Sequence, residues 1–249
     1  MKVKAILLAG GHGSRLYPFT KYTQKTLLPL HNRPVIDYAL GTIRRAGITD
    51  ITIVSNQFIG QITKHVGAGL PDERIHYVLE EDPTGVADAL NLARAYNEDC
   101  RLLIYFSDNI TTVELTEEVG TFSNAEHPPG CILLARQEAN PQAFGVAVLG
   151  QNGEVVDIVE KPENPPSDLA IGGIYMFDEA FWSFLDLGVE EKGENFSITD
   201  VNRRYIQQGM AKLITVGEDT WVDCGTPDSL LHASNMAKDG KLNPNPFRT

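Results

Sequence analysis

Cysteine is scarce in this sequence of 249 residues, which contains only Cys100, Cys131 and Cys224. They are widely spaced, and the sequence has neither a Cys-x-x-Cys pair nor a cluster of cysteine with histidine. The spacing therefore argues against a disulfide framework and a zinc site, and favours reduced thiols. No apolar run approaches the roughly 20 residues of a membrane-spanning helix. Because the first residues already read as a strand, we expect no signal peptide, no membrane partner and a soluble, cytoplasmic protein.

Basic residues are also few, since 21 lysines and arginines stand against 33 aspartates and glutamates, for a formal net charge of −12. A protein that binds nucleic acid or an anionic membrane over a broad face needs a basic surface. The composition therefore predicts no nucleic-acid partner. It leaves room for a local basic pocket.

Internal repeats, low-complexity segments and linkers are absent as well, so we expect one domain over residues 1–249. Its first half alternates strand-like and helix-like segments. The strand-like segments are residues 3–9, 51–55, 75–79, 102–106 and 131–135, and the helix-like segments are residues 34–46, 60–66, 86–96 and 114–122. This alternation predicts an α/β fold with a mostly parallel sheet and helices on both faces.

The second half is richer in strands. Residues 146–161 read as a hairpin with Asn152 and Gly153 at its turn. Further elements are expected as strands at 174–177 and 212–216 and as helices at 199–208 and 227–237, followed by a loose tail at 242–249. We therefore expect a nucleotide-binding half over about residues 1–140 and a smaller β-rich half over about residues 141–240.

A glycine-rich loop, Gly10–Arg15, directly follows the first strand. It matches neither the dinucleotide fingerprint G-x-G-x-x-G nor the P-loop, which needs Gly-Lys-Ser/Thr. Glycines nevertheless let backbone N–H groups approach an anion closely, and an arginine fork suits phosphate oxygens. The loop thus predicts a phosphate site at the carboxyl end of a buried strand. The simpler alternative is a tight turn with a surface arginine.

The longer stretch LAGGHGSRLYPFTKYTQKTLLPLHNRPVIDYAL resembles the opening signature of the sugar-1-phosphate nucleotidylyltransferases, and within them the glucose-1-phosphate thymidylyltransferase branch most closely. Later segments match in order: PTGVADAL, SDN, AFGVA, VEKPENPPSDLAIGGIYMFD, SITDVN and WVDCGT. The resemblance extends to about Ala237 and implies a Rossmann-like fold. It also implies an enzyme that joins a nucleoside triphosphate to a sugar 1-phosphate, with release of pyrophosphate.

On the nucleotide side, the resemblance implies that Arg15 and the loop amides hold the β- and γ-phosphates, and that Lys25 contacts the α-phosphate. The implied nucleotide-binding residues are Leu8, Ala9, Gly10, Gly11, Gly13, Ser14, Arg15, Glu80 and Gly85. Asp108 and Asp223 stand at the family's two metal positions, so Mg²⁺ is the expected cofactor.

On the sugar side, Lys161 is expected to neutralise the sugar phosphate and Glu160 to accept hydrogen bonds from sugar hydroxyls. The implied sugar-phosphate residues are Asn109, Gly145, Glu160, Lys161, Ile171 and Gly173. The implied catalytic set is Arg15, Lys25, Lys161 and Asp108. Relatives are often dimers or tetramers, so a homo-oligomer is a further expectation.

Two positions depart from the thymidylyltransferase pattern. Glu80 stands five residues before Gly85, where that branch has a glutamine that reads the base. An ionised glutamate can only accept hydrogen bonds, which suits guanine better than thymine or uracil. Ser197 replaces the glutamate of the Glu-Ile-Thr-Asp stretch, which makes a sugar other than glucose, or a cyclitol, conceivable.

The overall resemblance favours dTTP and glucose 1-phosphate as substrates. A guanylyltransferase acting on another sugar or cyclitol phosphate is one alternative, and a non-catalytic subunit that binds nucleotide sugars is another. A cytidylyltransferase for an alcohol phosphate fits less well, because Glu160-Lys161-Pro162 followed by a Gly-Gly-Ile-Tyr stretch favours a sugar.

Overall fold

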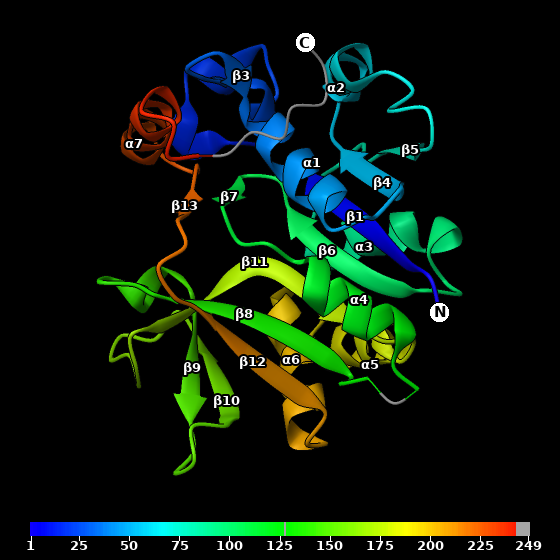
Figure 1. Ribbon diagram of the computed structural model, residues 1–249, viewed down its shortest axis with the longest axis vertical. Coiled ribbons are helices and arrows are strands. Elements are labelled where there is room, and N and C mark those ends of the chain that lie inside the picture. Colours follow the sequence, from blue (N-terminus) through cyan, green and yellow to red (C-terminus); the bar gives the residue numbers. More distant parts are fainter. Residues whose placement is uncertain (127, 243–249) are drawn as a thin grey trace.

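The sheet is built around β1 (Val3–Ala9), in which all residues but one are buried. The computed structural model describes residues 1–126 and 128–242, and in it β1 pairs in parallel with β4 (Asp50–Ser55) and β6 (Arg101–Phe106). A further parallel strand, β5 (Arg74–Leu79), pairs with β4 (Figure 1). Uninterrupted apolar runs suit strands that are covered on both faces. The predicted parallel sheet is thus confirmed; the tail expected at 242–249 lies outside the described residues except for Leu242.

Helices cover both faces of the sheet, as expected for an α/β fold. Alternate residues of a strand point to opposite faces, so Ala5 and Leu7 of β1 join one core cluster while Ile6 and Leu8 join the other. The first face is covered by α1 (Val35–Arg45), α2 (Ile59–Val66) and α4 (Thr116–Asn124), and the second by α3 (Val86–Ala93), α5 (Phe181–Lys192) and α6 (Ile198–Gln207).

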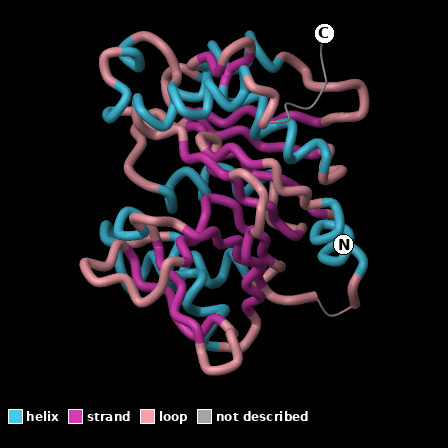
Figure 2. The backbone as a smooth tube through the Cα atoms, turned by 60° about the vertical axis from the view of Figure 1, so that its left-hand side comes forward, coloured by secondary structure: helices cyan, strands magenta, loops and turns pink. Residues whose placement is uncertain are grey.

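The β-rich half continues the same nine-stranded sheet through β11 (Leu169–Phe177), which pairs antiparallel with β6. On its other side β11 pairs with β8 (Cys131–Gln137), and at Ala170, opposite β8, it pairs with β9 (Gly145–Leu149). The sheet is completed by β10 (Val155–Glu160) and β12 (Ala211–Val216). Figure 2 shows the strands of both halves following one another without a gap.

Short strands bring distant segments to the same edge of the sheet. β13 (Trp221–Asp223) pairs antiparallel with β7 (Asn109–Thr111), directly after the end of β6. A second small ladder joins β2 (Pro29–Leu30) to β3 (Arg33–Pro34), against which α7 (Pro227–Lys238) lies. Among the described residues, no helix is long and apolar enough to cross a membrane.

The carboxyl ends of the parallel strands meet at one edge of the sheet. There the chain continues from β1 into Gly10, from β4 into Asn56, from β5 into Glu80 and from β6 into Ser107. Ligands of open α/β sheets bind at this edge. The topology therefore gathers the predicted phosphate loop and the predicted metal-binding segment in one place.

The packing of Trp221 on β11 gives a stability prediction. A Cβ atom at Gly172 would lie 2.2 Å from the Trp221 ring. Gly172→Ala should therefore lower the free energy of unfolding by about 1–3 kcal/mol, the usual cost of overpacking. In the control Gly120→Ala, within α4, the new Cβ meets no neighbouring atom within 4 Å. It should stabilise by about 0.5–1 kcal/mol. Urea unfolding measures both, and an unchanged midpoint for Gly172→Ala would contradict this packing.

Candidate active site

Two cavities adjoin at the carboxyl edge of the sheet. The larger has a volume of about 370 Å³ and lies over β11 and β9, and the smaller has a volume of about 290 Å³ and lies between the glycine loop and α3. Val86, Phe106 and Asp108 line both of them. A ligand that occupied both cavities would therefore pass the Asp108 carboxylate.

The glycine loop forms one wall of the smaller cavity through Gly10 and Gly11. Gly13 has a φ of 63°, and a Cβ there would lie 2.8 Å from Cγ2 of Thr20. The Thr20 hydroxyl donates to the Gly13 carbonyl at 2.8 Å, which fixes this turn. The loop conformation therefore requires glycine at position 13 for both its backbone angle and its packing.

Lys25 lies beside this loop and brings a positive charge to it. A Cβ at Gly11 would be 3.4 Å from the Lys25 Nζ, so the ammonium group reaches the wall of the cavity. The same Nζ contacts Oδ2 of Asp108, and both side chains are largely buried. The other carboxylate oxygen of Asp108 accepts a hydrogen bond from the Asn109 side chain at 3.1 Å. Lys25 therefore bridges the glycine loop and the metal-binding candidate.

Asp223 is brought to Asp108 by the short ladder between β13 and β7, which places Asp223 opposite Asn109. Next to it, the Cys224 N–H donates to the Asp108 carbonyl at 2.8 Å. Burial raises the pKa of the Asp223 carboxyl, and the negative charge of Asp108 raises it further. Lys25 and Arg15 act in the opposite direction. Two carboxylates with oxygen ligands only are the donor set that suits Mg²⁺.

Arg15 lies on the far side of Asp223 and lines the larger cavity rather than the smaller one. A Cβ at Gly225 would be 2.8 Å from the Arg15 Nη2 and 2.7 Å from Oδ1 of Asp223. The guanidinium group and the carboxylate therefore both lie against the Gly225 backbone. Glycine at 225 permits this close approach, and Arg15 adds a second cation to the region where the cavities meet.

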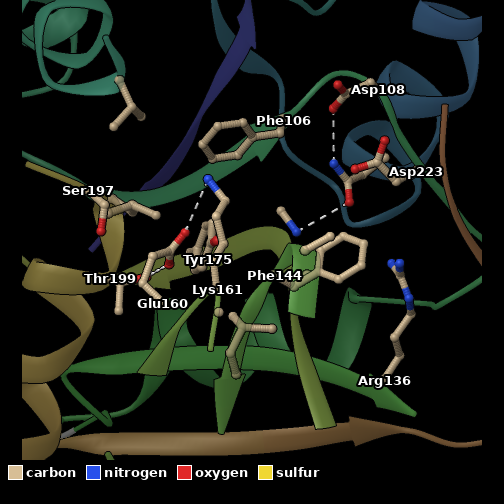
Figure 3. Close-up of a pocket in the computed structure, with 18 of the residues that line it drawn as sticks. Phe106, Asp108, Arg136, Phe144, Glu160, Lys161, Tyr175, Ser197, Thr199 and Asp223 are labelled. Carbon is tan, nitrogen blue, oxygen red and sulfur yellow. Dashed lines mark hydrogen bonds and ion pairs between the residues drawn. The ribbon is translucent and has the colours of Figure 1, made fainter. Parts of the chain in front are cut away.

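The far end of the larger cavity carries a second carboxylate with its own partners. Glu160, at the end of β10, accepts a hydrogen bond from the Thr199 hydroxyl at 2.6 Å, and its other oxygen lies 3.7 Å from the Lys161 Nζ. Gly145 lies close by, since a Cβ there would be 3.3 Å from Oε2 of Glu160. Figure 3 shows Glu160 between Thr199 and Lys161, on the side of the cavity opposite Asp108.

Asn109 connects the acidic end of this cavity to β11. Its side-chain oxygen accepts hydrogen bonds from the Trp221 indole at 2.8 Å and from the Gly173 N–H at 3.3 Å. A Cβ at Gly173 would be 2.6 Å from the Asn109 amide nitrogen, so only glycine allows this approach. The Asn109 side chain is therefore held by β13 and β11, and in turn it donates to Asp108.

The structure brings most of the predicted site residues to the two cavities. The predicted residues that line the smaller cavity are Leu8, Gly10, Gly11, Lys25, Glu80, Gly85 and Asp108, and those that line the larger one are Arg15, Asp108, Asn109, Gly145, Glu160, Lys161, Ile171, Gly173 and Asp223. Ala9, Gly13 and Ser14 line neither, since Ala9 is buried under the loop and Ser14 is exposed.

Sequence reasoning missed several residues that line the larger cavity. They are mainly aromatic or come from the middle of other elements: Phe106, Arg136, Phe144, Tyr175, Phe196 and Thr199. Arg136 stacks on the Phe144 ring, with 5.0 Å between its guanidinium carbon and the ring centre, and pairs with Glu138 at 3.0 Å. The aromatic rings give this cavity apolar lining beside its charged groups. Phe144, Tyr175 and Thr199 lie inside matched segments, but those segments did not single them out as site residues.

The comparisons with known proteins agree on the family. The family model described as nucleotidyl transferase matches residues 4–240. The nucleotidyltransferase Agl11 of low-salt glycan biosynthesis in Haloferax volcanii is 34% identical over 96% of this chain and 67% of its own length. A glucose-1-phosphate thymidylyltransferase of Streptomyces antibioticus is 34% identical over 93% of this chain and 65% of its own length. The chain thus spans about two thirds of the length of these relatives.

A solved structure gives the same picture. It comes from a Bacillus anthracis protein, provisionally named a glucose-1-phosphate thymidylyltransferase, in complex with sucrose. Its TM-score is 0.87 at 32% identity, with 96% of both chains covered. A UDP-glucose pyrophosphorylase with a TM-score of 0.82 is only 21% identical and bears on the fold alone. The family model, the relatives and the solved fold all lead to one conclusion, which confirms the resemblance seen in the sequence: the chain belongs to the nucleotidyl transferase family.

Proposed function

We propose that this protein transfers a nucleotidyl group from a nucleoside triphosphate to a sugar 1-phosphate, giving a nucleotide sugar and pyrophosphate. The observation that carries the proposal is the pair of adjoining cavities that share Asp108. The smaller one, beside the glycine loop, suits the nucleotide, and the larger one, with Glu160 and Lys161, suits the sugar phosphate. The names of the relatives, which are nucleotidyltransferases and thymidylyltransferases, support the same class of reaction.

The reaction needs alignment and charge neutralisation more than covalent chemistry. A phosphate oxygen of the sugar 1-phosphate attacks the α-phosphorus, and pyrophosphate leaves in line. Lys25 is placed to contact the α-phosphate, and Arg15 contributes a bidentate cation for the phosphates. Lys161, whose side chain is largely exposed at the cavity, is proposed to hold the sugar phosphate. Glu160 is proposed to accept hydrogen bonds from sugar hydroxyls.

Asp108 and Asp223 are the residues we propose for Mg²⁺. Among residues 1–126 and 128–242 no group of three or more histidine, cysteine or acidic side chains gathers as a metal site. A bound ion would therefore take its remaining ligands from phosphate oxygens and water, as Mg²⁺ commonly does. When bound, the ion would neutralise phosphate charge. The mutual repulsion of the two carboxylates fits a site that a divalent cation completes.

The relatives suggest a reference pair of substrates, and the lining of the larger cavity suggests alternatives to the sugar. The thymidylyltransferases among the relatives make dTTP and glucose 1-phosphate the reference pair for assays. Ser197 lines the larger cavity at the position where that branch has a glutamate, and the wall beside it includes Phe196. Glucose bound in this cavity would thus lack the glutamate carboxylate as an acceptor for one of its hydroxyls. Other sugar 1-phosphates and cyclitol phosphates therefore belong in the same panel.

The proposed role of Asp108 can be tested by Asp108→Asn. Pyrophosphate release in the presence of Mg²⁺ should fall by about 100-fold or more, because a charged metal ligand is replaced by a neutral amide. The assay uses the substrate pair that the unchanged protein turns over fastest. Asp82→Asn, at an exposed residue outside both cavities, is the matched control and should keep full activity. Equal turnover by both variants would refute the metal assignment.

The raised pKa of Asp223 predicts that replacing this residue stabilises the protein, although the replacement impairs activity. A carboxyl whose pKa is higher in the folded protein binds more protons there than in the unfolded chain. Its contribution to stability is therefore lost as pH rises through the unfolded and folded pKa values.

At neutral pH, Asp223→Asn should accordingly raise the free energy of unfolding by about 1 kcal/mol, while Mg²⁺-dependent pyrophosphate release falls. Denaturation in the absence of Mg²⁺, at neutral and at acidic pH, measures the difference. The gain should shrink toward acidic pH, where the Asp223 carboxyl is itself protonated. A variant that is less stable at neutral pH would contradict the described repulsion.

A further inference from the structure

Glu80 is a buried carboxylate that lines the smaller cavity. It directly follows β5, and its N–H donates to the Ser55 carbonyl at 2.8 Å, which anchors its backbone at the carboxyl edge of the sheet. Only 3% of the residue is exposed. Its carboxylate packs flat against the glycine loop, since a Cβ at Gly10 would be 2.0 Å from Oε2. The position of the carboxylate thus depends on a glycine at residue 10.

In the described part of the chain this carboxylate has no hydrogen-bond donor. Among residues 1–126 and 128–242, no hydrogen bond or ion pair reaches the Glu80 side chain. Two amide side chains at the glycine loop are already used, because Asn56 donates to the Gly10 carbonyl at 2.9 Å and Gln24 donates to the Ala9 carbonyl. Burial raises the pKa of Glu80 and Asp88 raises it further, whereas His12, which lines the same cavity, lowers it. Because the carboxylate lines the cavity and has no donor from the described part of the protein, a ligand in the cavity that brings donors would form hydrogen bonds with it.

The hydrogen-bonding edges of the nucleobases differ in what they offer a carboxylate. Guanine presents two adjacent donors, N1–H and the N2 amino group. Thymine and uracil place their single N3–H between two carbonyl oxygens, which would face the carboxylate unfavourably. Adenine and cytosine each present an amino group next to a ring nitrogen that accepts. Because an ionised carboxylate only accepts, guanine alone can satisfy both of its oxygens.

We infer that Glu80 reads the base of the nucleoside triphosphate and selects guanine, so that GTP is the nucleotide substrate. The inference rests on the proposed function, because it takes the smaller cavity to be the nucleotide site. The remaining walls fit this role. Leu8, Pro83, Val86 and Ala89 line the cavity around Glu80 and give apolar surfaces for a flat ring. Gly11 and Lys25, on the same cavity, mark its phosphate end.

The test measures binding of the triphosphates alone, so that it does not depend on the sugar. Dissociation constants for GTP, ITP and dTTP are determined by calorimetry with Mg²⁺ at about pH 8, where a free carboxylate is ionised. ITP lacks the N2 amino group and so removes one of the two donors. GTP should bind about 10-fold or more tightly than either ITP or dTTP, since each lost charge-assisted hydrogen bond costs about that factor.

Two variants test whether Glu80 causes the preference for GTP. Glu80→Gln keeps the shape but offers one donor and one acceptor, which match the N3–H and a carbonyl of thymine. It should weaken the binding of GTP and strengthen the binding of dTTP. The dissociation constants of GTP and ITP should become nearly equal. Glu81→Gln is the matched control, because Glu81 is exposed and lines neither cavity. It should leave all three dissociation constants unchanged.

The outcomes separate the two proposals. The inference about guanine is wrong if dTTP binds as tightly as GTP, or if Glu80→Gln leaves the ratio of the GTP and ITP dissociation constants unchanged. The proposed nucleotide site would still stand. A Glu80 carboxyl that kept its proton would act like an amide and would give this result. If none of the triphosphates binds, the proposed function itself fails. A GTP preference that Glu80→Gln abolishes and Glu81→Gln retains supports the inference.

Discussion

Two carboxylates, Asp108 and Asp223, are held together at the place where two anionic substrates are proposed to meet. Burial raises the pKa of Asp223 and the charge of Asp108 raises it further, and among the described residues Lys25 and Arg15 are the cations that oppose this effect. We propose that this arrangement lowers the stability of the free protein and that a bound Mg²⁺ ion compensates for it. Much of the site follows from this constraint. The glycine loop lets Lys25 come close, Gly225 makes room for Arg15, and Asn109 holds Asp108 in position.

The sequence predicted best those segments in which apolar residues form a clear pattern, either a continuous run or a regular repeat. β1, with its apolar run, was predicted residue by residue, and the parallel strands beside it were placed to within one residue at each end. β7 and β13 have only three residues each, so they carry no period and depend on each other for pairing. α5 was missed because its polar and apolar residues separate weakly and Gly188, which packs against Phe196, interrupts it. Such elements are determined by tertiary contacts.

The candidate site divides in the same way. Residues inside long motifs, such as Lys25, Asp108 and Lys161, were predicted because the motif fixes them whatever their surroundings. Arg136 and Phe144 were not, since Arg136 lies outside the matched segments and the contact between the two side chains forms only after folding. Glu80 belongs to both classes. Its position was suggested by spacing, but its burial and its lack of a donor are visible only in the structure.

The continuity of the sheet has a mechanical consequence. β11 is hydrogen-bonded to β6, to β8 and, at one residue, to β9, so the wall beneath both cavities is one piece of sheet. A protein with two bodies on a flexible hinge can swing them apart to admit large molecules, but this fold would have to break backbone hydrogen bonds to do so. The hydrogen-bonded sheet thus favours entry and release through the loops above it. Residues 161–168, which link β10 to β11 and begin with Lys161 at a φ of 44°, form one loop beside the larger cavity.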